Sequence, residues 1–451
     1  IKSVMSSVAE AELGALYINA RETVPCRSVL HEMGHFLPAK WFKCRVEKFY
    51  LFFNPWFSLF KKKVGETEYG LGWFPMGGYV DIEGMIDETK DASQLASEPQ
   101  PYEFRAKPAW QRLIVMLGGI IINVITGVAI FWALAYQTGY TFISKKEVNK
   151  LGIVAYPLAE EMGLKTGDKI VDISGKDFTD FNDIRSSEVM LGENNYYTVL
   201  RGTEKIEVPI PNDLVNSISE DDYDGKFIEP IQTFEIAAIA PDSPAEQVGL
   251  KESDKIIALN GKKIQFYHEF VQLANQNASK KVQLDILRGA DTLQLAPTLT
   301  EEGKLGFNAS FNLAFEHIDY TLGQAFVEGS NRAFGVITDN IKGFKKIFSG
   351  EVSAGKAMSG PIGIARKMYG GVWDWSRFWM ITGILSMALA FMNLLPIPAL
   401  DGGHAVLLIY EMVSGKKPSE KFMERTQQAG TFILLALLIL IMFNDAIKAI
   451  F

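Results

Sequence analysis

Cysteine is nearly absent from this chain: Cys26 and Cys44 are its only two in 451 residues. This scarcity excludes a small fold held together by disulfides, and any zinc or iron–sulfur site built from several thiolates. A bound metal would therefore have to be held by histidine and carboxylate groups. Histidine is scarce as well, with five in the chain, so each one can be considered separately.

Charge of one sign is not concentrated anywhere in the sequence. Lysine and arginine number 45 against 53 aspartates and glutamates, which gives a net charge of −8. Long blocks of like charge are absent, and so is the basic patch that typically contacts nucleic acid. We therefore expect no nucleic-acid partner.

The first thirty residues lack a long apolar run. Their longest charge-free stretch, residues 13–20, is too short for a bilayer span, which takes about 20 residues. The apolar core of a signal peptide is not visible either. Six charged residues are spread over the segment: Lys2, Glu10, Glu12, Arg21, Glu22 and Arg27.

Long apolar stretches occur further along. Residues 113–136 carry no charge and form the clearest candidate for a membrane-spanning helix. Residues 378–397 are also uncharged, and residues 429–443 form a shorter run unless residues 446–451 extend it. We expect three spans and the lipid bilayer as their surroundings. The alternative, buried helices of a large soluble protein, suits the short run better than the long one.

The polar region between the first two apolar stretches contains an internal repeat. The run that begins at Ala159 recurs at Ala245, and Gly175-Lys176 recurs with the same spacing at Gly261-Lys262. Each copy predicts a helix start, a glycine turn, an isoleucine-rich strand, a hairpin, a helix and a final alternating strand. The run from Asp242 to Glu246, Asp-Ser-Pro-Ala-Glu, resembles the signature of PDZ domains. We predict two tandem PDZ domains, which either bind peptides along a sheet edge or act as a steric gate.

The motif His31-Glu32-Met33-Gly34-His35 places two imidazoles on one face of a helix, with a carboxylate between them. Zn²⁺ takes two ligands from one helix in this way, and the glutamate then serves as the general base. A catalytic zinc ion needs a third protein ligand.

Asp401 is the best candidate for that third ligand. It follows Pro396 and Pro398 and precedes Gly402 and Gly403, so the second apolar stretch should break there, at membrane depth. Irregular backbone at that depth is tolerated only inside protein or beside a wet cavity, and an aspartate there indicates function. The alternative is an aspartate that caps a helix in a turn.

The remaining histidines are weaker candidates. His404 lies three residues beyond Asp401 and is the alternative third ligand, although we favour a packing or hydrogen-bonding role for it. His268 and His317 have no neighbours at ligand spacing, and we expect them to be structural or on the surface.

Together these motifs resemble the site-2 proteases, which are intramembrane zinc metalloproteases, and specifically the bacterial branch with two periplasmic PDZ domains that cleaves anti-sigma factors. The resemblance runs from about His31 to Phe451. It rests on His31 to Phe36, Pro75 to Val80, Lys107 to Arg112 with Asn123, the PDZ pair, Gly360 to Gly363, and Asn393 to Gly403.

The resemblance implies His31, His35 and Asp401 as zinc ligands and Glu32 as the catalytic base. Asn393 is implied to hold the substrate or its oxyanion. A β-hairpin loop over about residues 72–81 is implied to dip into the membrane and present a sheet edge to substrate, with Gly77, Gly78 and Tyr79 in contact with it. The implied substrates are single-pass membrane proteins such as anti-sigma factors.

The implied fold is a multi-pass α-helical membrane protein with an inserted pair of β-rich PDZ domains and a membrane-associated β-hairpin loop. The implied location is the bacterial inner membrane, with the PDZ domains in the periplasm. The cytoplasmic side is also indicated by the basic residues that flank the first two spans, namely Arg105, Lys107, Arg112, Lys416, Lys417, Lys421 and Arg425. We predict an atypical segment at 1–30, the zinc motif, loop and first span at 31–140, PDZ domains at 141–225 and 226–300, a linker with amphipathic helices at 301–377, and two further spans at 378–451.

Residues 1–30 depart from the family, which carries a membrane-spanning helix at this point. Residues 6–16 instead resemble the end of a retroelement RNase H domain, so we predict a chimeric, misassembled or mispredicted start, with a real soluble N-terminal segment as the alternative. We expect the chain as given to hold the helix from His31 to His35 poorly, with low zinc occupancy and little proteolysis. The alternative function is that of an inactive PDZ scaffold or pseudoprotease. Nuclease activity is set aside, since the other acidic strands of an RNase H site are missing.

Overall fold

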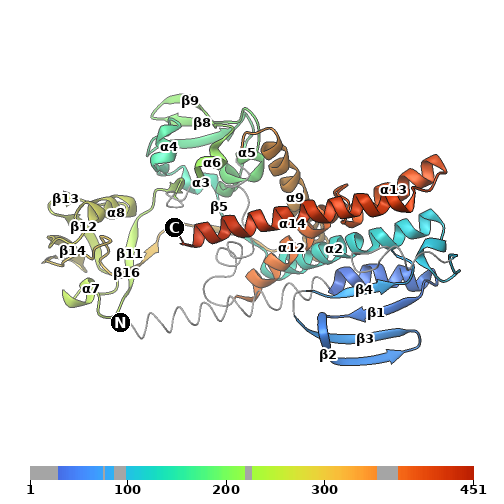
Figure 1. The fold of residues 1–451 in the computed structure, drawn as a ribbon. Coiled ribbons are helices and arrows are strands. Elements are labelled where there is room, and N and C mark those ends of the chain that lie inside the picture. The colour runs from blue at the N-terminus through green and yellow to red at the C-terminus, as the bar shows by residue number, and fades with distance from the viewer. Residues whose placement is uncertain (1–28, 75–76, 86–97, 219–225, 353–373, 451) are drawn as a thin grey trace. The chain divides into compact units, whose positions relative to one another are not determined.

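The computed structural model describes residues 29–74, 77–85, 98–218, 226–352 and 374–450 (Figure 1). The chain forms two compact units, one from its two ends and one from residues 140–318. The motifs at Pro75-Met76 and Gly360 to Gly363, and residues 1–28 of the atypical N-terminal segment, lie outside the described residues.

The first unit is built around one long helix, α2 (Ala109–Thr138) (Figure 1). Three other helices pack against it: α9 (Leu322–Phe348), α12 (Trp375–Leu394) and α13 (Asp401–Ser414). A helix over residues 29–41 lies against α2 through Gly34. On α9, Gly329 meets the backbone of α2 so closely that an added Cβ would lie 2.5 Å from the Trp132 nitrogen. The unit also contains η2 (Phe104–Ala106) and α14 (Glu420–Ile450).

Two helices in the described part of the chain are long and apolar enough to cross a membrane: α2 and α12. Helix α2 covers the first predicted span, and α12 covers the second as far as Leu394. The third predicted span lies within α14, which is a continuous helix but is not one of these two. The third crossing therefore stays a prediction.

The predicted break after the second apolar stretch is present. Helix α12 ends at Leu394 and α13 begins at Asp401. Pro396 and Pro398 have no N–H to continue the helical hydrogen bonds, and Ala399 adopts a φ of 80°. The chain therefore turns sharply between the two helices, and Asp401 stands in the first turn of the second.

A four-stranded sheet joins the helix over residues 29–41 to η2 and α2. Its strands are β1 (Val46–Tyr50), β2 (Phe53–Val64), β3 (Thr67–Phe74) and β4 (Tyr79–Ile82), in the spatial order β2-β3-β1-β4. Strand β4 is therefore an edge strand within the described sheet, and it pairs with β1 in antiparallel fashion.

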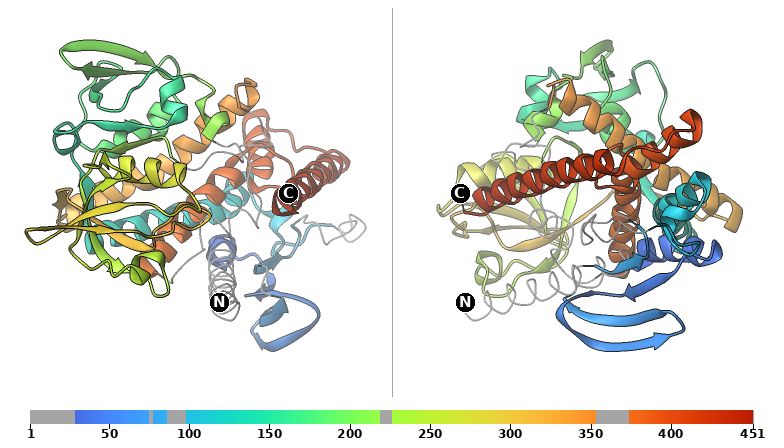
Figure 2. Two further views of the ribbon diagram at one scale, coloured as in Figure 1. Left: turned by 90° about the vertical axis from the view of Figure 1, so that its left-hand side faces the viewer. Right: turned by 45° about the vertical axis from the view of Figure 1, so that its right-hand side comes forward.

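The prediction of a hairpin over residues 72–81 is wrong. Strands β3 and β4 do not pair with each other, because β1 lies between them and is parallel to β3. The hairpin is instead formed by β2 and β3, where Gly65 has the positive φ of 63° that a two-residue turn requires. Figure 2 shows this hairpin extending away from the helices of the first unit. It carries exposed aromatic side chains, among them Trp56 at 92% exposure.

The second unit contains two hydrophobic cores. The first module has its core between Val148 and Ile228, and the second module between Phe234 and Leu305. Strands β5 (Tyr140–Ile143) and β17 (Phe315–Ile318) pair where the chain enters and leaves the unit. The PDZ assignment stays a prediction that rests on the sequence motif.

The two modules have closely related strand arrangements. In the first, β10 pairs with β6 and a separate sheet has the order β7-β8-β9. In the second, β11 pairs with β16 and the main sheet has the order β13-β12-β14-β15. The first module comprises α3 (Lys145–Val148), β6 (Ile153–Ala155), α4 (Pro157–Glu161), β7 (Lys169–Ile173), η3 (Phe181–Arg185), α5 (Ser187–Met190), β8 (Tyr196–Arg201), β9 (Glu204–Pro209), α6 (Leu214–Ile218) and β10 (Ile228–Pro230). The second comprises β11 (Phe234–Ile239), α7 (Pro244–Gln247), β12 (Lys255–Leu259), β13 (Lys262–Lys263), α8 (Tyr267–Gln276), β14 (Leu284–Arg288), β15 (Asp291–Leu295) and β16 (Phe307–Phe311).

An ion pair is repeated in both modules with the same geometry. Arg288 donates two hydrogen bonds, of 2.8 and 2.7 Å, to the two carboxylate oxygens of Asp254. Asp254 is only 1% exposed. Arg201 makes the same two contacts with Asp168 in the first module. These hydrogen bonds from Arg288 hold the pKa of the Asp254 carboxyl below its usual range.

The first prediction concerns Arg288→Met, which leaves the Asp254 carboxylate buried without its cation. We expect the unfolding free energy of the second module to fall by about 2 kcal/mol, less than for a fully buried pair because Arg288 is partly exposed. Hydrogen exchange of β12 and β14 in the full-length chain should quicken by about 30-fold, with the first module unchanged. Arg201→Met is the matched control and should affect the first module alone. Equal opening of both modules by either variant would contradict the assignment of one stabilising ion pair to each module.

The second prediction concerns pH. Because the pKa of Asp254 is lower in the folded module than in the unfolded chain, the unfolded chain binds more protons as the pH falls. The stabilisation is present above the unfolded-chain pKa of about 3.9 and is lost progressively as the pH falls through the lower pKa of the folded module. Exchange of β12 and β14, corrected for the intrinsic effect of pH, should rise over this range and rise less steeply in Asp254→Asn. An identical pH dependence in that variant would count against the ion pair.

Candidate metal centre

The helix over residues 29–41 carries His31, Glu32 and His35, and a close approach of two glycines brings it onto α2. A Cβ at Gly34 would lie 2.3 Å from the carbonyl oxygen of Gly118, and one at Gly118 would lie 1.9 Å from that of Gly34. Any larger residue at either position would force the helices apart. The two histidines come from successive turns, and their ring centroids are 4.8 Å apart.

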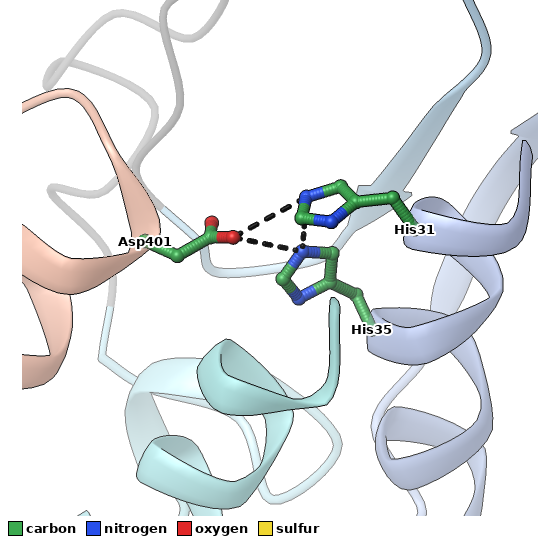
Figure 3. Close-up of side chains that lie close together, drawn as sticks. All are labelled: His31, His35 and Asp401. Carbon is green, nitrogen blue, oxygen red and sulfur yellow. Dashed lines mark hydrogen bonds and ion pairs between the residues drawn. The ribbon is translucent and has the colours of Figure 1, made fainter. Parts of the chain in front are cut away.

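The break between α12 and α13 brings Asp401 to these histidines, as Figure 3 shows. Its Oδ2 atom lies 3.3 Å from His31 Nε2 and 3.4 Å from His35 Nε2. The two Nε2 atoms are 3.2 Å apart. Both histidines are buried, and the Asp401 side chain is mostly so. Among the described residues this is the one group of three histidine, cysteine or acidic side chains that could hold a metal ion.

The three separations match those that a zinc ion imposes on its ligands. A tetrahedral Zn²⁺ with bonds of about 2.0–2.1 Å keeps its ligand atoms about 3.3–3.4 Å apart. The donor set of two imidazoles and a carboxylate is also one that catalytic zinc sites use. The residues therefore fit a zinc ion in both chemistry and spacing.

Helix α2 orients one of the imidazoles through its backbone. His35 Nδ1 lies 2.8 Å from the carbonyl oxygen of Val115, which can only accept a hydrogen bond. The proton of His35 must therefore be on Nδ1, and Nε2 keeps its lone pair toward Asp401. This is the arrangement that a metal-binding histidine needs.

Glu32 lies beside the three residues and contacts the edge strand. The backbone N–H of Val80 on β4 donates a hydrogen bond of 3.1 Å to Glu32 Oε2. That N–H is not used in the pairing of β4 with β1, so it points to the open side of the strand. The carboxylate is thus held at the edge of the sheet, next to the histidines of its own helix.

Gly77 and Gly78 directly precede this edge strand, and Tyr79 is its first residue. Gly77 has a φ of 130°, and a Cβ at Gly78 would lie 2.6 Å from the Tyr50 carbonyl oxygen. Tyr79 stacks on Tyr50 and donates a hydrogen bond of 3.0 Å to Asn54. These residues therefore fix the path of β4 toward Glu32.

Asn393 and His404 lie in different surroundings. The Nδ2 atom of Asn393 is 3.3 Å from His31 Nε2 and 3.4 Å from Asp401 Oδ2, so it borders the same cluster. His404 lines a separate small cavity of about 60 Å³ together with Arg112 and Glu411. It is not part of the three-residue group.

One further residue borders the cluster, and the sequence motifs include it without predicting a role for it. Asn123, in the middle of α2, is 0% exposed, and its amide nitrogen lies 3.1 Å from His31 Nδ1. An amide in the middle of an apolar span was a usable signal, since polar side chains at that depth are costly and usually functional.

Comparison with known proteins gives a match over most of the chain. Peptidase family M50 matches residues 27–437. The regulator of sigma-E protease RseP of Escherichia coli is 28% identical over 447 residues, which cover 92% of this chain and 95% of that protein. The regulator of sigma E protease of Haemophilus influenzae is 26% identical, over 93% of this chain and 96% of that protein. A candidate zinc metalloprotease of Clostridium perfringens is 26% identical, over 93% and 95%.

The third prediction concerns Gly119, the glycine of α2 that faces the imidazoles. A Cβ there would lie 2.4 Å from His35 Nε2 and 2.5 Å from His31 Cε1. Gly119→Ala should therefore push the rings out of position and lower the zinc bound per chain severalfold, with the helices still folded. Metal analysis after dialysis, with circular dichroism for folding, would measure this.

Gly127→Ala on the same helix is the control, because its Cβ would meet the flexible Met387 side chain. It should bind zinc like the parent protein. If Gly119→Ala also kept its full zinc content, the imidazoles would not lie against Gly119.

Proposed function

We propose that this chain, which belongs to peptidase family M50, cuts a peptide bond within or near the membrane-spanning segment of single-pass membrane proteins. The geometry of the candidate metal centre supports this function most directly. Three ligand atoms with the spacing of a zinc site lie beside a glutamate that is hydrogen-bonded to an edge strand.

Membership of this family confirms three of the sequence predictions: the family itself, the enzyme class of metalloprotease, and zinc as the cofactor. Family M50 is embedded in membranes, in agreement with the two apolar helices. The ligands, the substrate and the orientation in the membrane belong to the proposal.

The proposed zinc ligands are Nε2 of His31, Nε2 of His35 and Oδ2 of Asp401. When bound there, zinc supplies a Lewis acid that polarises the substrate carbonyl and makes water more acidic. The burial of these residues keeps bulk water from the histidines and the carboxylate, so their interactions are stronger than they would be in solvent.

Glu32 is the proposed general base. Its carboxylate accepts the proton of the attacking water and then donates it to the amine of the leaving peptide. The hydrogen bond from Val80 holds the carboxylate toward the open side of β4. A substrate strand that lies along this edge would have its backbone next to Glu32.

The edge strand also explains how a helical substrate could be cut. The amides of a membrane helix are bonded within the helix, so the segment must unwind before its carbonyls can be attacked. An unwound segment finds new hydrogen-bond partners by adding to a sheet edge. We propose that the edge at Gly77, Gly78 and Tyr79 serves this purpose. Asn393, beside His31 and Asp401, would hold the substrate or its oxyanion.

Two relatives carry the name regulator of sigma-E protease, and this name favours anti-sigma factors as the substrate class. We further propose that the protein lies in the bacterial inner membrane and that the two modules are PDZ domains in the periplasm. The alternative, an inactive scaffold or pseudoprotease, is less well supported because His31, Glu32, His35 and Asp401 are all present and lie together.

The fourth prediction separates the general base from the metal ligands. Glu32→Gln should keep one zinc per chain and lose cleavage by about 10²- to 10⁴-fold, because only proton transfer is removed. Asp401→Asn should lose both zinc and cleavage. Zinc content and cleavage of an anti-sigma factor reporter in proteoliposomes are measured on the same samples. Asp401→Asn with normal zinc and normal cleavage would make His404 the next ligand to test, and an active Glu32→Gln would rule out Glu32 as the base.

A further inference from the structure

We propose that Asn123 is a positioning residue for the metal centre: its side-chain oxygen accepts a hydrogen bond from Nδ1–H of His31 and so fixes that imidazole for zinc. The proposal rests on the proposed function, in which His31 is a ligand. Asn123 is completely buried in α2, and its amide lies 3.1 Å from His31 Nδ1.

The chemistry of histidine decides which end of the amide must face the ring. With Nδ2 of Asn123 facing His31, the amide can only donate, so Nδ1 would need its lone pair free and the proton would sit on Nε2. But Nε2 is the atom that faces Asp401 and His35. A proton there would exclude the metal.

Rotation of the amide by 180° removes this conflict. The nitrogen and oxygen of an asparagine amide have nearly the same shape, so the two orientations occupy the same space. As placed, Asn123 Oδ1 is buried without a hydrogen-bond partner among the described residues. Rotated, that oxygen accepts the proton of Nδ1 and His31 Nε2 is free to bind. One amide atom lacks a partner in either orientation, so the requirement at His31 decides.

The two imidazoles would then be oriented by one helix in the same way. Val115 supplies a backbone carbonyl to His35, and Asn123 supplies a side-chain carbonyl to His31. Asn123 is itself held from α12, because the Ser386 hydroxyl donates a hydrogen bond of 2.9 Å to its backbone oxygen. An acceptor on the far nitrogen both fixes the ring and makes a metal-binding histidine more basic.

The test uses two variants of the full-length protein in detergent, with zinc affinity measured by competition against a chromophoric chelator. Asn123→Leu has a similar volume and no acceptor, and we expect its zinc affinity to fall by about 10- to 100-fold. Asn123→Asp keeps an acceptor at the same place and should bind zinc at least as tightly as the parent. Asn340→Leu on α9, far from the cluster in sequence, is the matched control and should leave the affinity unchanged.

Unchanged affinity in Asn123→Leu would overturn the proposal, and so would equal loss in the leucine and aspartate variants, since a purely structural role tolerates neither. A second measurement needs no variant: ¹⁵N NMR of the zinc-loaded parent should show a proton on Nδ1 of His31. A proton on Nε2 would also overturn it. If the parent protein bound no zinc at all, the proposed function itself would fail, which is a distinguishable result.

Discussion

The contact of Gly34 with Gly118 is the constraint on which the metal centre depends. Only the absence of side chains at both positions lets the helix over residues 29–41 approach the backbone of α2 this closely. That approach puts His35 within hydrogen-bond distance of Val115 and His31 within reach of Asn123. Helix α2 thus orients both imidazoles, while Asp401 and Asn393 reach them from α13 and α12.

Helix α2 also holds the far end of the chain. Arg112 on α2 forms a largely buried ion pair with Glu411 on α13, ten residues beyond Asp401. Asn393, near the end of α12, lies beside His31 and Asp401. Contacts with α2, the helix that also orients the histidines, therefore bring the Asp401 carboxylate to them. The sharp turn at Pro396 to Ala399 places Asp401 at the start of α13, facing the histidines.

Sequence patterns predicted the parts of the site that depend on local spacing. His31 and His35 follow from the helical period, and Asp401 from the two prolines and two glycines that break an apolar run. The pairing of β1 between β3 and β4 was not predictable in this way, because it depends on contacts remote in sequence. The same holds for Asn123, whose partner His31 lies on another helix, and for the ion pair of Arg112 with Glu411. Residue types indicated that these groups matter without indicating what they touch.

The central claim is that one zinc ion is held by two imidazoles and one carboxylate. X-ray absorption at the zinc edge of the metal-loaded, full-length protein tests it directly. The account predicts one zinc per chain with a first shell of nitrogen and oxygen at about 2.0–2.2 Å, and the multiple-scattering pattern of two imidazole rings. A sulfur neighbour at about 2.3 Å, or a shell of oxygen atoms without imidazole scattering, would contradict it.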